Sequence, residues 1–333
     1  MSLQIAIYPI IENIMKKLLF LIMLLLMLPL TSLAQLMACR GFVEEGYDFW
    51  LYLPDSYENA EELPLVMFLH GKSLSGDSLE MVLQYGSIHA LFKGRAINAI
   101  VVAPQAQTAW EPKRVMALYD WLDDHYKVDT NRFYVLGMSM GGYGAMDVAT
   151  EYPDRVAAAM AMCGGASGKE LCGLSTLPLW IIHGTADKAV PVGCSDRVVD
   201  SIRSCGDTTR LIYDRLEGVN HSRLARVFYL KQTYDWLFSH SLKDRGRPVN
   251  RSYSMSTDLL DVAYDNMDEK FTVNIVEAVY PKLRVKKKFY VVKKGDTLAS
   301  IAVENYTTVS ILCKLNKFKK DTKLWRGRKV RVK

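Results

Sequence analysis

Short apolar runs, separated by segments with helical periodicity, are the strongest pattern in this chain. Four runs are almost continuously apolar: LPLVMFLHG, NAIVVAPQA, FYVLG and LPLWIIHG. Runs of this kind are typical of strands buried on both faces of a parallel sheet. Further strands are expected at 41–54 (near a sheet edge), 155–165 and 209–218, and helices at 110–127, 141–152, 196–203 and 227–240. The alternation predicts an α/β fold, a mostly parallel sheet covered by helices on both faces.

Charge divides the chain into two parts. Residues 282–333 contain 17 Lys and Arg against three acidic residues, a net charge of +14; the whole chain carries +6, so residues 1–281 carry −8. Such a change of sign marks a domain boundary. Half of the residues are apolar, which is ordinary globular composition and not that of a fibre or a disordered chain. Between the two parts, residues 241–288 lose the regular pattern, and we expect a linker with room for local structure.

The N-terminal segment, residues 1–34, reads as an extension followed by a signal peptide. Two lysines precede the apolar run Leu18–Leu30, and small residues lead to a cleavage point before Gln35. Met15 is a candidate for the natural start. A transmembrane anchor is the less favoured alternative because polar residues break the run before it reaches bilayer length; lipidation at Cys39 is a second. We expect an exported protein, periplasmic, envelope-associated or secreted, with no stable membrane span after cleavage.

The expectation of export affects how the six cysteines are interpreted. Cys163 and Cys172 are close in sequence, as are Cys194 and Cys205, and in an oxidising compartment such pairs can form disulfides. The sequence leaves the connectivity open. Because no Cys-x-x-Cys pattern or histidine cluster accompanies them, we expect no structural zinc site.

Three residues suggest a catalytic triad. The segment GMSMGGYG places Ser139 directly between the strand FYVLG and a helix, the context that a nucleophile elbow requires, although alone it could be a glycine turn. Asp187 in HGTADKAVP and His221 in LEGVNHS each follow a predicted strand, and either alone could be an ordinary loop residue. Together they occur in the α/β-hydrolase order Ser, Asp, His. We predict that His221 activates Ser139 and that Asp187 orients His221, with no metal or organic cofactor required.

An acyl-transfer site also needs backbone N–H donors for the oxyanion. The N–H of Met140, at the start of the predicted helix, is one candidate. A second is the N–H of Lys72, in the loop after His70 and Gly71. His70 itself more often shapes such a loop than acts as a base.

Residues 41–240 resemble the secreted α/β-hydrolases grouped with feruloyl esterases and polyhydroxybutyrate depolymerases. The resemblance rests on LPLVMFLHG, VDTNRFYVLGMSMGGYGAMDVATEYPDRVAAAMAMCGG, LPLWIIHGTADKAVP and LEGVNHS. In that family the serine, aspartate and histidine of these motifs form the triad, which implies the same roles for Ser139, Asp187 and His221. The loop KSLSGDSLE departs from the family's small-residue pattern, and this departure concerns the Lys72 donor.

Residues 289–333 resemble a LysM domain, a small β-α-α-β carbohydrate-binding module, through YVVKKGDTLASIA, ILCKLN and LWRGRKVRV. The resemblance implies a groove for N-acetylglucosamine-containing glycans such as peptidoglycan. It would be formed by two loops, with the candidate residues Gly295, Asp296, Thr297, Lys320, Asp321 and Lys323. The alternative is a basic tail for nucleic acid or acidic membrane. The ordered strand and helix signals argue against a mere tail, and export argues against nucleic acid.

These observations favour an exported serine esterase, a carboxylic-ester hydrolase tethered to peptidoglycan or a related glycan. Two alternatives stay open. One is a serine peptidase of the prolyl-oligopeptidase type, although no residues are available for its propeller. The other is a non-catalytic peptidoglycan-binding protein with a degenerate hydrolase domain. The acyl and alcohol parts of the ester substrate are not identified; Trp110 and Tyr143 are candidates for the pocket wall.

Overall fold

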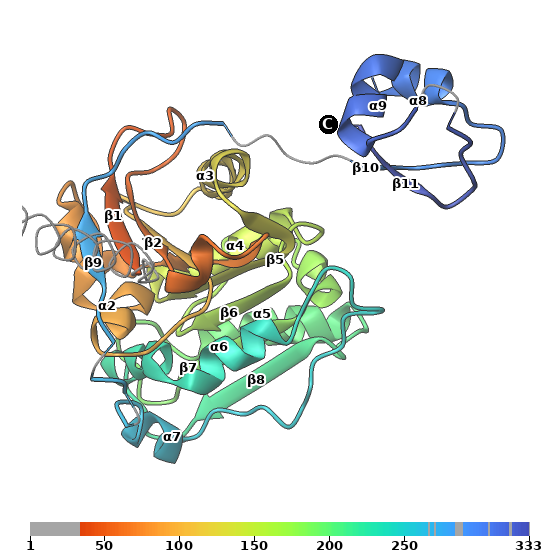
Figure 1. Cartoon of the computed structure of the whole chain (residues 1–333). Helices are drawn as coiled ribbons and strands as arrows, with labels where there is room; N and C mark the ends of the chain where they lie inside the picture. The colour runs from red at the N-terminus through yellow and green to blue at the C-terminus, as the bar shows by residue number, and fades with distance from the viewer. Residues whose placement is uncertain are drawn as a thin grey trace, which may run out of the picture.

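The computed structural model of the protein describes residues 34–265, 267–269, 271–283, 289–305, 307–319 and 322–332. The expected signal peptide lies almost entirely outside these residues. Among the described residues a nine-stranded sheet has the order β8-β7-β6-β5-β3-β4-β2-β1-β9 (Figure 1). Its strands are β1 (Gln35–Cys39), β2 (Phe49–Leu53), β3 (Leu63–Leu69), β4 (Ile100–Pro104), β5 (Val128–Met138), β6 (Ala158–Met162), β7 (Leu179–Gly184), β8 (Leu211–Leu216) and β9 (Asn274–Val276).

The sheet is mixed but mostly parallel, as the apolar runs predict. The six neighbouring strands from β8 to β4 are parallel, while β2 is antiparallel to both β4 and β1. Of the strands expected over 41–54, β2 lies within that range, whereas β1 precedes it and is separated from β2 by a turn that includes Gly41 at φ 65°. The parallel strands align their carboxyl ends along one edge, which is where sites form in this architecture.

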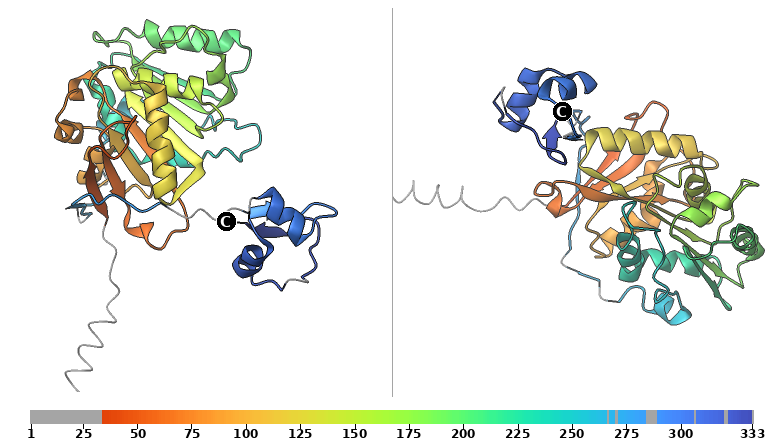
Figure 2. Two further views of the ribbon diagram at one scale, coloured as in Figure 1. Left: turned by 90° about the horizontal axis from the view of Figure 1, so that it is seen from above. Right: turned by 90° about the vertical axis from the view of Figure 1, so that its right-hand side faces the viewer.

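Helices cover both faces of the sheet (Figures 1 and 2). One face packs on α3 (Pro112–His125), α4 (Met140–Glu151) and α5 (Gly193–Ser204). The other packs on α2 (Ser87–Phe92), α6 (Lys231–Phe238) and α7 (Thr257–Asp261). Alternate residues of each strand face opposite cores, as in β3, where Val66 and Phe68 enter one and Leu65 and Met67 the other. This two-sided burial explains why the strands read as continuous apolar runs.

Much of the expected linker packs on this fold. In the segment 241–283, Val249, Met255 and Leu260 are buried in the core, and β9 pairs in parallel with β1 at the edge of the sheet. The hydroxyl of Tyr280, also in this segment, accepts a hydrogen bond from the Trp121 ring at 3.2 Å. The expected linker with room for local structure thus contains packed residues over 241–283, and scattered contacts of this kind have no periodicity that a sequence pattern could show.

The C-terminal residues form a second small fold. Strands β10 (Phe289–Val291) and β11 (Lys329–Arg331) are antiparallel, and α8 (Leu298–Glu304) and α9 (Val309–Asn316) lie between them in the chain. Thr297 and Ser300 form a capping box at the start of α8, and Thr308 caps α9. Seven buried apolar residues form the core of this unit, among them Ile301, Leu312 and Val330. The β-α-α-β order is the one predicted.

One disulfide is present among the described cysteines, and its pairing differs from both sequence-local pairs. Cys172 is bonded to Cys205, 33 residues away, which ties the 3-10 turn Cys172–Thr176 to the end of α5. Cys39 and Cys163 are buried and free. Within the described part of the chain, no helix combines the length and apolar character needed to cross a bilayer.

Candidate active site

Ser139 stands in a strained turn between β5 and α4. Its backbone has φ 59° and ψ −122°, a conformation that residues other than glycine rarely adopt. The turn is possible because glycines flank it: a Cβ on Gly137 would lie 2.2 Å from the Gly141 carbonyl oxygen, and one on Gly141 would lie 1.8 Å from that of Leu69. The Ser139 N–H donates to the Met162 carbonyl at 2.9 Å. The geometry is that of a nucleophile elbow.

Asp187 and His221 are brought together from the loops after β7 and β8. The Nδ1 atom of His221 lies 2.7 Å from Oδ2 of Asp187 and donates its proton to that oxygen. The other carboxylate oxygen, Oδ1, accepts the N–H groups of Ala189 and Val190 at 2.9 Å each. Burial alone would raise the pKa of Asp187, but these donors outweigh it and the pKa is lowered. Asp187 is therefore a stable anion that fixes the tautomer of His221 and leaves its Nε2 as an acceptor.

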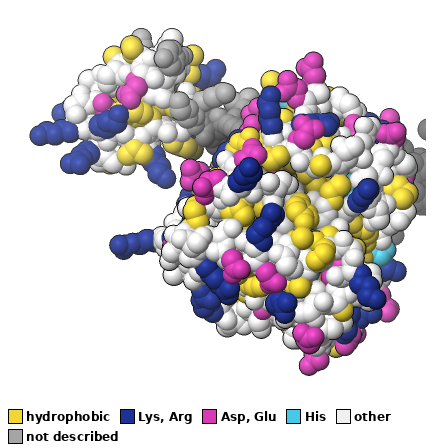
Figure 3. Space-filling view, turned by 180° about the vertical axis from the view of Figure 1, so that it is seen from behind, with side chains coloured by type: hydrophobic (Ala, Val, Ile, Leu, Met, Phe, Trp, Pro, Cys, Tyr) yellow, Lys and Arg dark blue, Asp and Glu magenta, His cyan; other side chains and the backbone are white. Residues whose placement is uncertain are grey.

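Ser139 and His221 line the same pocket, which has a volume of about 790 Å³. The Asp187 side chain is fully buried behind it, whereas the His221 side chain keeps 26% of its surface exposed. Trp110 and Tyr143, the suggested wall residues, both line the pocket. Figure 3 shows hydrophobic side chains gathered across the middle of the face seen there, between scattered charges.

The loop after β3 runs beside the nucleophile. A Cβ on Gly71 would lie 3.3 Å from the Cβ of Ser139, and the next residue, Lys72, lines the pocket at the start of the 3-10 turn Lys72–Leu74. Met140 lines the same pocket at the start of α4. Both residues expected to supply oxyanion donors thus line the pocket that Ser139 lines.

His70 shapes this loop and is not available as a base. Its Nε2 accepts the Ala106 N–H at 3.0 Å, so Nδ1 carries the proton and donates to the Gly71 carbonyl at 2.8 Å. The side chain is fully buried, and burial lowers its pKa to about 4. The ring is neutral at physiological pH, with both nitrogens already engaged.

A serine–histidine pair that the sequence did not suggest lies beside the Asp187–His221 pair. Nδ1 of His183 is 2.8 Å from Oγ of Ser195, and Nε2 of His183 is 3.4 Å from Oδ2 of Asp187. Both side chains are 0% exposed. His183 ends the apolar run of strand β7, at the first position of HGTADKAVP, and Ser195 lies near the start of α5, so the sequence did not connect the two. A substrate cannot reach Ser195 without unpacking the sheet from α5.

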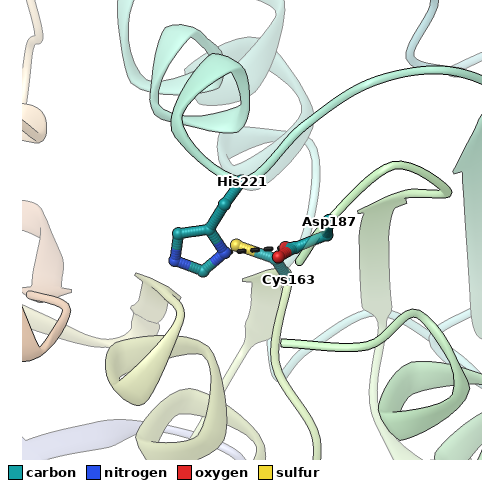
Figure 4. Close-up of side chains that lie close together, drawn as sticks. All are labelled: Cys163, Asp187 and His221. Atoms are coloured by element: carbon teal, nitrogen blue, oxygen red, sulfur yellow. Dashed lines mark hydrogen bonds and ion pairs between the residues drawn. The ribbon is translucent and has the colours of Figure 1, made fainter. Parts of the chain in front are cut away.

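Cys163 is the third group beside the Asp187–His221 pair (Figure 4). Its sulfur lies within 4.8 Å of the ligand atoms of both residues, a cluster that could in principle hold a metal ion. The donor set does not fit one. Burial raises the pKa of the thiol far above its ordinary value, and Nδ1 of His221 carries a proton that it donates to Asp187.

Comparison with known families matches two segments of the chain. Residues 101–197 match the family described as "Putative esterase", and residues 290–333 match the LysM domain. The chain carries an esterase-family domain and a LysM domain. Ser139 and Asp187 fall inside the esterase match; His221 lies beyond its end.

Individual relatives cover part of the chain. A bifunctional acetylxylan esterase/xylanase from Neocallimastix patriciarum is 27% identical over 155 residues, which are 43% of this chain and 22% of that enzyme. Similar solved structures include a thermostable esterase (24% identity, TM-score 0.49, 58% of this chain and 59% of that chain) and a ferulic acid esterase (15%, 0.47, 59% and 97%). Another is a mutant feruloyl esterase module from Clostridium thermocellum complexed with sinapinate (15%, 0.45, 58% and 84%). The chain thus spans less than two thirds of the xylanase and of the thermostable esterase.

The LysM domain has a groove where the resemblance implies one. It has a volume of about 460 Å³ and is lined by Asp296, Thr297, Leu298, Ala299, Val309, Thr322, Lys323 and Leu324. Three of the candidate glycan-binding residues, Asp296, Thr297 and Lys323, therefore line it. Gly295 adopts φ 91° in the turn before them. Lys320 and Asp321 lie outside the described residues.

Proposed function

We propose that the esterase-family domain is a serine hydrolase that cleaves carboxylic esters at Ser139. The observation that carries the proposal is the hydrogen bond from Nδ1 of His221 to Asp187, made while His221 and Ser139 border one pocket. This bond leaves Nε2 of His221 as the acceptor that a serine nucleophile needs.

In the first half of the reaction, Nε2 of His221 removes the Ser139 hydroxyl proton as Oγ attacks the ester carbonyl carbon. The carbonyl electron pair moves to oxygen, and the N–H groups of Met140 and Lys72 stabilise that oxyanion. The positive end of α4 adds to this stabilisation, because the helix begins at Met140. When the intermediate collapses, the C–O bond to the alcohol breaks and His221 returns the proton to the leaving oxygen.

In the second half, water replaces the alcohol. His221 takes a proton from water, the hydroxide oxygen attacks the acyl-enzyme carbonyl, and the bond to Ser139 Oγ breaks as that oxygen regains its proton. The products are an alcohol and a carboxylic acid. Asp187 stabilises the imidazolium in both halves and remains ionised throughout.

The competing pair, Ser195 and His183, lacks both requirements of a nucleophile. Ser195 is fully buried, and its hydroxyl donates a hydrogen bond to the Gly164 carbonyl oxygen at 2.7 Å. His183 uses both ring nitrogens within the protein. We therefore assign the nucleophile to Ser139.

The substrate class that fits best is an ester borne by a carbohydrate. The name of the Neocallimastix patriciarum relative, a bifunctional acetylxylan esterase/xylanase, supports this choice, as does the coupling of the esterase-family domain to a LysM domain. Trp110 and Tyr143 give the pocket an aromatic wall on which an acyl chain or a sugar ring can pack.

The test of the nucleophile compares two serine variants. Ser139→Ala should abolish hydrolysis of a short-chain aryl ester and labelling by a fluorophosphonate, while the matched control Ser195→Ala should still be labelled and should keep a rate within about tenfold of the wild type. If Ser139→Ala keeps wild-type turnover, the assignment fails. If the wild-type protein neither labels nor turns over any ester of a panel, the non-catalytic alternative gains support; faster cleavage of peptides than of esters would favour the peptidase.

We propose further that the LysM domain holds the enzyme on a peptidoglycan-type glycan in the cell envelope after export. The groove around Asp296 and Thr297 supports glycan binding, and the net charge of +14 over residues 282–333 would add attraction to anionic envelope polymers. Figure 3 shows Lys and Arg side chains projecting from this unit. Removal of residues 289–333 should abolish co-sedimentation with purified peptidoglycan; retained binding would contradict the proposal.

Export after cleavage before Gln35 fits the position of the first strand. β1 begins at Gln35, and Leu36 and Cys39 in it are fully buried. Lipidation at Cys39 would need this residue at a free N-terminus, without the four residues that pair with β2. We therefore favour cleavage by a signal peptidase, which N-terminal sequencing of the mature protein would test.

A further inference from the structure

Two imidazoles lie near one oxygen of the Asp187 carboxylate. Oδ2 lies 2.7 Å from Nδ1 of His221 and 3.4 Å from Nε2 of His183. His221 reaches the pocket, whereas His183 is fully buried in β7, four residues before Asp187. The proposed mechanism uses only the first of the two.

The protons on His183 follow from its neighbours. Nε2 faces only acceptors, the Val190 carbonyl at 2.9 Å and Oδ2 of Asp187, so it must carry a hydrogen. Nδ1 faces Oγ of Ser195, whose single proton is shared between Nδ1 and the Gly164 carbonyl. Burial lowers the pKa of His183, which favours the neutral ring, and its unprotonated Nδ1 then competes with the Gly164 carbonyl for the Ser195 proton. In either protonation state, the Nε2–H donor points towards Val190 and Asp187.

The Nε2–H group of His183 holds the loop that carries the Asp187 carboxylate. Val190 accepts from His183 through its carbonyl and donates its N–H to Oδ1 of Asp187 at 2.9 Å. Ala189 donates to the same oxygen, and both Ala189 and Val190 line the pocket. A change at His183 therefore reaches two N–H donors of Asp187 and one wall of the pocket.

From these contacts we infer that His183, held by Ser195, is a positioning residue that orients Asp187 towards His221. The inference rests on the proposed function, since it gives Asp187 a catalytic task. The buried Ser195–His183 pair is then a support for the triad and not a second catalytic centre. The charged or titratable groups that act on His183 are Asp187, His221 and Asp196.

The test compares His183→Leu, which removes the donor at similar volume, with His183→Gln, whose amide can still donate to Val190. Rates of aryl-ester hydrolysis are normalised to active sites counted by fluorophosphonate labelling. We expect His183→Leu to lower kcat by about 10- to 100-fold, with KM changed less than about threefold, because misplacing an orienting group costs rate more than binding. His183→Gln should recover most of the loss.

A pH profile separates positioning from a general loss of folding. If Asp187 is held loosely, the imidazolium of the base is stabilised less, and the acid limb of kcat/KM should move to lower pH in His183→Leu. Fewer folded molecules would lower the uncorrected rate without moving that limb. The inference is overturned if His183→Leu has a normalised kcat and an acid limb like those of the wild type. Failure of the proposed function would instead appear as activity in Ser139→Ala.

Discussion

Ser139 and His221, and Ser195 and His183, are chemically alike residues in different surroundings. Ser139 and His221 border a pocket, and among the described residues only Nδ1 of the His221 ring is hydrogen-bonded. Ser195 and His183 are buried, with the hydroxyl and both ring nitrogens engaged inside the protein. Proximity of a serine to a histidine therefore does not identify a nucleophile. Access, and an imidazole nitrogen left without a partner, distinguish the two.

The backbone repeats the contrast. Ser139 is held at φ 59° in a turn packed between glycines, whereas Ser195 lies in the regular first turn of α5. Strain that persists in a folded protein is concentrated at functional sites. The serine in the unfavourable conformation is also the accessible one, and this coincidence supports its assignment independently of the hydrogen bonds.

The largest effect should come from the residue that both pairs share. Asp187→Asn keeps the size of the side chain but cannot hold His221 as a carboxylate does, so we expect kcat for an aryl ester to fall by about 10⁴-fold. Ser195→Ala, measured beside it, should stay within about tenfold of the wild type. Equal losses in the two variants would erase the distinction between the pairs.

Most of the first pair could be predicted from sequence, and the second pair could not. Ser139, Asp187 and His221 each follow a predicted strand, so their places at one edge of the sheet follow from the fold class. His183 belongs to such a strand itself and reads as part of its apolar run. Its partner Ser195 lies 12 residues on, in a helix with an ordinary amphipathic pattern.

The same reasoning explains the other differences between expectation and structure. The Cys172–Cys205 bond joins two segments that no local pattern connects. Strand β9 has three residues and pairs with β1 across most of the chain length, so no periodicity announces it. Contacts between short, distant segments are the part of a fold that single-sequence patterns do not encode.

Buried histidines should make the free energy of unfolding depend on pH. Burial lowers the pKa of His240 to about 4, and its Nε2 has no hydrogen-bond partner among the described residues. Because the unfolded chain binds this proton near pH 6.5, the free energy of unfolding should fall as the pH drops from 7 towards 4, by about 3 kcal/mol for this residue.

Urea denaturation of His240→Phe beside the wild type at pH 7, 5.5 and 4.5 measures this contribution. The variant should lose less stability between pH 7 and 4.5 than the wild type, since it removes one group whose folded pKa is depressed. His70, with a pKa of about 4, should give the same dependence in both proteins. Parallel pH curves for the two proteins would show that His240 does not titrate as expected.

Loss of the disulfide should lower the stability of the protein, in which α5 carries Ser195, and should leave the rate of ester hydrolysis unchanged. Cys205 ends the helix that carries Ser195, and the Cys172–Cys205 bond closes a loop over a sequence separation of 33 residues. Replacing both cysteines by serine should lower the free energy of unfolding by about 2–4 kcal/mol. The kcat of the folded variant at 25 °C should stay near the wild-type value, as measured by ester hydrolysis. A large loss of kcat would mean that α5 positions the catalytic groups more directly.

The smallest expected effects are on the stability of variants at the two serines. In Ser139→Gly the elbow keeps its φ of 59° without the steric cost of a Cβ, whereas Ser139→Ala retains that cost. We expect the glycine variant to be about 1 kcal/mol more stable to urea than the alanine variant. Ser195→Ala should be about 1–3 kcal/mol less stable than the wild type, because it leaves the buried Gly164 carbonyl and Nδ1 of His183 without their shared partner. A glycine variant less stable than Ser139→Ala would mean that the elbow is not strained at this residue, and the backbone argument for Ser139 would then fail even if the hydrogen-bond argument held.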